Sequence, residues 1–114
     1  MGQGNEIAQE TWTQIPLRTK IAVGALAREA VANGRTLWIR VRIRRGATHK
    51  IKITLAGNDT YCLELHRILA LHEWTPDGPL SEVITTVDDI YFDMLGPMIE
   101  QLCFPRQETI YADR

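Results

Sequence analysis

Residues 37–45 read Leu-Trp-Ile-Arg-Val-Arg-Ile-Arg-Arg, and their alternation of apolar and polar side chains constrains the fold more than any other stretch. Successive side chains of a β-strand point to opposite faces, so a period of two indicates a strand with two unlike faces. One face would pack into a core, and the other would carry a tryptophan and several arginines. We therefore expect a sheet with one apolar and one cationic face.

The alternation predicts three consecutive strands, at 36–45, 49–56 and 60–68. All apolar side chains share one face only if the numbers of paired residues sum to an even value. Three-residue loops that contain Gly or Asn meet this condition, pairing Ile43 with Ile51 and Leu55 with Tyr61. The prediction is a three-stranded antiparallel meander.

Helical spacing of apolar residues predicts a helix on each side of the meander, at about 16–33 and 86–102. In the second helix Pro97, next to Gly96, should produce a kink. Residues 83–86 could add a short edge strand. We thus expect an α+β domain in the order α-β-β-β-α, with both helices on one sheet face. Its expected limits are a flexible arm at 1–14, a single domain at 15–105 and a tail at 106–114.

The net charge of −1 conceals an asymmetry between the two halves of the chain. Residues 1–67 carry eleven Lys and Arg against five Asp and Glu, whereas residues 68–114 carry two against nine. Such polarity indicates an electrostatic partner, or two halves that neutralise each other.

In the expected register, Arg42 would lie beside Lys52 on the cationic face, a repulsion that costs about 0.2–1 kcal/mol per pair unless an anion covers it. We therefore expect non-catalytic binding of a polyanion, with nucleic acid favoured because an indole can stack on a base while cations contact phosphates. The candidate residues are Trp38, Arg40, Arg42, Arg44, Lys50 and Lys52.

A protein-interaction module is the alternative. The acidic half would supply the contact surface, for inhibition of a host complex or for a homodimer, and the cationic face could instead bind an acidic protein surface. Its candidate residues are Trp74, Asp88, Asp89 and Asp93. The paired aspartates also fit the first turn of a helix, where carboxylates are favourable.

No reaction-specific motif is present, and we expect no enzyme, cofactor, metal or small-molecule substrate. Cys62, Glu64 and His66 would share one face and could form a nucleophile–base set. The sulfur and the imidazole, however, lie about 13 Å apart along a strand, too far to share a metal ion even with His49 or His72 recruited.

The two cysteines do not form a disulfide framework, and no secretory signal or membrane-spanning run is evident. A cytoplasmic location without membrane contact is expected.

One stretch, Ile53-Thr54-Leu55-Ala56-Gly57-Asn58-Asp59-Thr60-Tyr61, precedes Arg67-Ile68 and Ile90-Tyr91-Phe92-Asp93-Met94-Leu95. It resembles small uncharacterised phage and mobile-element proteins, in which an LNG-x-D-x-Y hairpin precedes a VY-x-x-x-L helix. The resemblance implies a mobile-element origin, where small modules bind host proteins or nucleic acid, anti-CRISPR inhibitors among them; it assigns no functional residue.

The predicted element order also resembles double-stranded RNA-binding domains. Val87-Asp88-Asp89 stands where that family has a Lys-rich helix start, so the RNA-binding activity of the family is not inferred for this chain.

Overall fold

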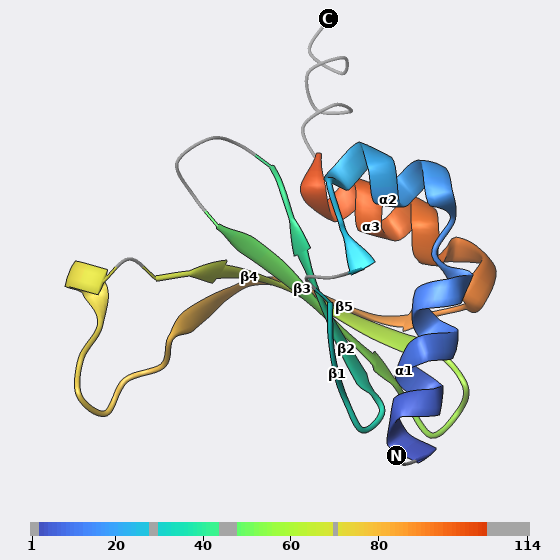
Figure 1. Ribbon diagram of the computed structural model, residues 1–114, viewed down its shortest axis with the longest axis horizontal. Helices are drawn as coiled ribbons and strands as arrows, with labels where there is room; N and C mark the ends of the chain where they lie inside the picture. The colour runs from blue at the N-terminus through green and yellow to red at the C-terminus, as the bar shows by residue number, and fades with distance from the viewer. Residues whose placement is uncertain (1–2, 28–29, 44–47, 70, 105–114) are drawn as a thin grey trace, which may run out of the picture.

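The computed structural model describes residues 3–27, 30–43, 48–69 and 71–104. Within them, one antiparallel sheet in the order β1-β2-β3-β4-β5 carries three α-helices on one face (Figure 1). The strands are β1 (Val31–Asn33), β2 (Thr36–Val41), β3 (His49–Leu55), β4 (Tyr61–Ile68) and β5 (Ser81–Ile90). The helices are α1 (Gln3–Gln14), α2 (Leu17–Val23) and α3 (Leu95–Cys103), with 3-10 turns η2 (Leu71–Glu73) and η3 (Phe92–Met94). The expected three-stranded meander with two helices is therefore wrong.

The core lies between the helices and the odd-numbered face of the central strands. Burial alternates along β2, β3 and most of β4, which confirms the period-two pattern. The sheet contributes the buried residues Leu37, Ile39, Val41, Ile51, Ile53, Tyr61, Leu63 and Leu65. The helical layer contributes Ala8, Ile15, Val23, Leu95, Ile99 and Leu102.

Helix α1 occupies most of the stretch that we expected to be an arm at 1–14. Ala8 and Thr11 are buried, and Trp12 packs against the core, so one side of the helix is covered by the sheet. The ammonium of Lys20 lies 4.2 Å from the centre of the Trp12 ring, which ties α1 to α2. The stretch is helical because these residues recur at helical spacing, although its mean polarity is high.

The helix expected at 16–33 ends at Val23 because Gly24 adopts a left-handed conformation, with φ of 73°. Its N–H donates to the carbonyls of Lys20 and Ile21, as glycine does at helix C-termini. The chain then forms β1 rather than more helix. Asn33-Gly34, at the end of the expected helix, instead begins the tight turn into β2, with Gly34 at φ of 64°.

The second expected hairpin is confirmed, since Leu55 pairs with Tyr61. The first keeps its parity but is shifted, because Ile51 pairs with Ile39 and not with Ile43. Strand β2 stops at Val41 because the N–H of Arg42 donates to the carbonyl of Val23 at 2.7 Å instead of to β3. The connection between β2 and β3 is consequently longer than three residues.

The helix expected at 86–102 is a strand followed by a shorter helix. β5 pairs with β4 through to Ile90, and shifts in that register mark bulges that break its alternation. Helix α3 starts only at Leu95, so Pro97 falls in its first turn. There the missing N–H of proline costs no helical hydrogen bond, which removes the reason for the expected kink.

Candidate functional site

The face of the sheet opposite to the helices carries one aromatic and three basic side chains in two adjacent rows. Trp38 pairs with Lys52, and Lys52 with Glu64; in the next row Arg40 pairs with Lys50, and Lys50 with His66. We call Trp38, Arg40, Lys50 and Lys52 the cationic face. Each is partly exposed.

Trp38 lies at the centre of these side chains. The Lys52 ammonium is 5.7 Å from its ring centre, within the range of a cation–π attraction. The His66 ring meets the indole edge-on, with centroids 5.0 Å apart and planes at 61°. Within the described residues, neither Lys50 nor Lys52 forms an ion pair, so both ammonium groups are available to an external anion.

His66 is held by two hydrogen bonds of its imidazole. Its Nε2 lies 2.9 Å from Oε1 of Glu64, and its Nδ1 lies 3.0 Å from Oγ of Ser81. The side chain is only 9% exposed. Sequence reasoning missed Ser81, because only the pairing of β4 with β5 brings it to His66.

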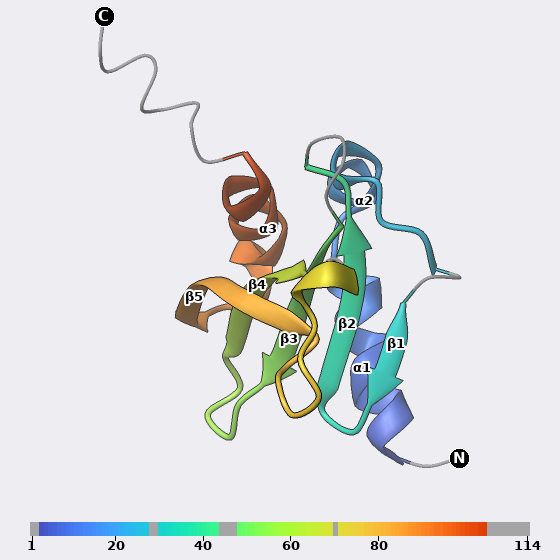
Figure 2. The same ribbon diagram turned by 90° about the vertical axis from the view of Figure 1, so that its left-hand side faces the viewer.

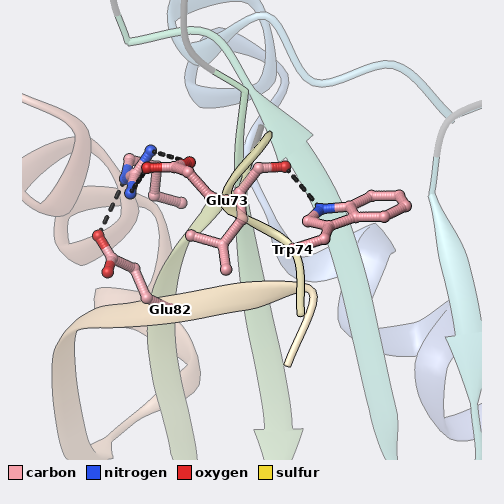
Figure 3. Close-up of polar contacts among 5 residues, drawn as sticks. Glu73, Trp74 and Glu82 are labelled. Atoms are coloured by element: carbon pink, nitrogen blue, oxygen red, sulfur yellow. Dashed lines mark hydrogen bonds and ion pairs between the residues drawn. The ribbon is translucent and has the colours of Figure 1, made fainter. Parts of the chain in front are cut away.

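The segment between β4 and β5 crosses the sheet on the side opposite to α1 and α2 (Figure 2). Arg67 fastens it, with Nε 2.9 Å from Glu82 and two further nitrogens each 3.3 Å from Glu73. Figure 3 shows both carboxylates directed at one guanidinium, and the Trp74 indole N–H donating to the carbonyl of Leu69 at 3.0 Å. These contacts hold the segment against the sheet.

A hollow of about 290 Å³ lies between this segment and the sheet, at the lower limit for small-molecule pockets. We call it the Trp38 hollow. Its lining combines aliphatic side chains with an indole, an ammonium and a hydroxyl: Val31, Trp38, Lys50, Ile68, Leu80 and Ser81.

Two residues expected on the cationic face are not placed there by the structure. Arg42 follows the end of β2, and its stem lies against Gly24, where an added Cβ would be 2.8 Å from Arg42 Cδ. The expected neighbourhood of Arg42 and Lys52 is therefore wrong; Trp38 stands opposite Lys52. Arg44 lies outside the described residues, as does the tail at 106–114.

The residues of the alternative site are separated. Trp74, 46% exposed, follows η2 near the start of β5, whereas Asp88 and Asp89 lie near its other end. A strand of ten residues spans roughly 30 Å. The expected helix-start role of the aspartates is wrong, because both belong to β5; Asp93 lies in η3.

Cys62, Glu64 and His66 share a face as expected, but His66 contacts Ser81 rather than the thiol. Burial, followed by the neighbouring carboxylate of Asp88, raises the pKa of Cys62 to about 11. Such a thiol holds little thiolate at neutral pH and is a poor nucleophile. Within the described ranges, no group of three or more His, Cys, Asp and Glu could hold a metal ion.

Comparison with protein-family models, curated proteins and solved structures finds no match to this chain, and the phage and mobile-element resemblance stays a prediction. Among the described helices, none has the length and apolar character needed to cross a membrane.

Proposed function

We propose that the cationic face binds a polyanion, and that this polyanion is a nucleic acid strand. The observation that carries the proposal is the position of Trp38 beside Lys52 and one row from Lys50, on the face opposite to the three α-helices, next to the segment between β4 and β5. A base of any identity can stack on an indole ring, while ammonium groups contact the phosphates of the strand.

The arrangement also has an energetic reason. Lys50 and Lys52 lie two residues apart on one face of β3, so their like charges repel each other. A phosphate over the two rows would relieve this repulsion. Glu64 stands opposite Lys52 and keeps its negative charge while it accepts from His66, so it offsets only one of the three positive charges of the cationic face.

Fluorescence polarisation of a labelled oligonucleotide across a salt series tests the proposal. The logarithm of the association constant should fall linearly with the logarithm of the salt concentration. Lys50→Gln should make this slope less steep by about 0.7–0.9, the value of one phosphate contact. Lys50→Glu should weaken binding further. Arg18→Glu is the matched control, since it makes the same charge change at an exposed position of α2. Absence of binding at low salt, or equal losses in the two charge reversals, contradicts the proposal.

A second candidate function is protein binding along β5, favoured by the exposure of this edge strand. Val83 is 53% and Ile84 48% exposed, and edge strands with open backbone groups accept further strands. Because Glu82, Asp88 and Asp89 are acidic, the fitting partner is an extended basic segment. The double variant Asp88→Lys/Asp89→Lys should then abolish binding of a basic, strand-forming peptide that Lys50→Glu leaves intact; the reverse pattern excludes this candidate.

A further inference from the structure

We propose that Ser81 is a nucleophilic serine that accepts an acyl group in the Trp38 hollow, with His66 as general base and Glu64 as the residue that orients the imidazole. This activity is additional to polyanion binding and does not depend on it. The three side chains form one hydrogen-bonded series, with distances of 3.0 Å from Ser81 to His66 and 2.9 Å from His66 to Glu64. Both lie within the range required for proton transfer.

The chemistry of the partners sets the direction of the proton. An ionised carboxylate only accepts hydrogen bonds, so Nε2 of the neutral imidazole carries the hydrogen that Glu64 accepts. Nδ1 is then the basic nitrogen, and the hydroxyl of Ser81 donates to it. This is the order of roles in a serine nucleophile, its base and its orienting acid, with the two ring nitrogens exchanged relative to the chymotrypsin arrangement.

The surroundings hold this geometry. His66 lies on β4 and Ser81 on β5, and the two strands pair through Ile68 opposite Ser81. The indole of Trp38 packs edge-on against the imidazole. A base shielded in this way keeps its orientation, which is the main requirement for general base catalysis.

The Trp38 hollow indicates the class of substrate. It is small and mostly apolar, with Ser81 in its lining, so an ester with a short apolar acyl group fits it. Lys50 lines the same hollow and supplies positive charge for the oxyanion that forms when a carbonyl is attacked.

The reaction balances without a further reagent. Oγ of Ser81 bonds to the carbonyl carbon as its proton passes to Nδ1 of His66. The tetrahedral intermediate then expels the alcohol, which takes that proton as the ester C–O bond breaks. Water repeats the sequence on the acyl-serine, releasing the acid and restoring the hydroxyl.

The test uses a short-chain alkyl fluorophosphonate, which phosphonylates activated serines with loss of fluoride, together with p-nitrophenyl acetate hydrolysis. Ser81 is the single serine of the chain, so the adduct mass and its position by peptide mapping are unambiguous. The folded wild-type protein should form one adduct at Ser81, and Ser81→Ala should lose it along with ester hydrolysis. Thr85→Ala, which removes an exposed hydroxyl from the same strand, is the matched control and should react like wild type.

His66→Gln should slow labelling at least about a hundredfold, the usual contribution of a general base. For the positioning role, Glu64→Gln should retain more activity than Glu64→Ala at equal thermal stability, because only the amide keeps an oxygen that accepts from Nε2. The inference is overturned if wild type forms no adduct, if His66→Gln is labelled at the wild-type rate, or if Thr85→Ala loses as much activity as Ser81→Ala. Oligonucleotide binding by Ser81→Ala should equal that of wild type, so the two proposals fail separately.

Discussion

Gly96 of α3 lies against the start of α2, and its replacement by alanine probes that contact. A Cβ at this position would lie 2.7 Å from Cδ and 2.9 Å from Cγ of Pro16, and 2.9 Å from Oγ1 of Thr19. Carbon atoms prefer about 3.5–4.0 Å. Neither neighbour can turn away freely, because the proline ring is rigid and Thr19 donates to Glu100 at 2.7 Å. The two helices must therefore separate.

The expected loss of stability follows from two opposing effects. Overpacking of this kind costs about 1–3 kcal/mol, whereas alanine gains about 1 kcal/mol over glycine within a helix. The difference is about 0–2 kcal/mol, so we expect Gly96→Ala to lower the free energy of unfolding by about 1 kcal/mol, and the melting temperature by roughly 4 °C.

Urea unfolding followed by circular dichroism measures this difference. Gly57→Ala is the matched control, because a Cβ there meets no atom within 4 Å and the backbone is not left-handed, so its unfolding midpoint should stay close to wild type. A Gly96→Ala protein as stable as wild type, or more stable, would refute the close packing of α2 on α3.

Three further outcomes are expected. Because the pKa of Cys62 is raised to about 11 from 9.0, its thiolate fraction at pH 8 should be about a hundredfold lower than that of an ordinary thiol, and disulfide-exchange reagents should modify it readily only in denaturant. Burial raises the pKa of Cys103 to about 12, so the folded state favours the neutral thiol. The stability that results is complete below the unfolded pKa near 9 and is lost as the pH rises toward 12. The urea midpoint should therefore fall between pH 8 and 10.5, and Cys103→Ala should reduce that fall. Arg67→Gln should release the segment between β4 and β5, seen as a red shift of Trp74 emission with little change in the melting temperature, whereas an unchanged spectrum would mean that the ion pairs do not hold it.

Local alternation was enough to place the central strands and to divide their residues between two faces. Leu37, Ile39 and Ile53 are buried as expected, because side-chain direction in a strand depends only on parity. The hairpin from β3 to β4 was also predictable, since its short loop follows directly from the alternating segments.

Other local signals were present but open to two interpretations. Asn33-Gly34 suits a helix end as well as a hairpin, and the apolar residues from Val87 to Met94 fit helical spacing by coincidence. The bulges in β5 broke the alternation that would have identified a strand, so pairing with β4 overrode the local pattern. Tyr91 and Met94, two of the apolar residues in that helical spacing, are 63% and 46% exposed.

The sequence by itself determined that a sheet with one apolar and one basic face would form, because that property needs only the period of the side chains. Tertiary structure decided which basic residues share the face, since the bond from Arg42 to Val23 ends β2 and sets the register against β3. It also decided the meeting of Ser81 with His66, which are fifteen residues apart in the chain. Contacts of that kind depend on strand pairing across a long connection, and no local pattern encodes where the returning strand will lie.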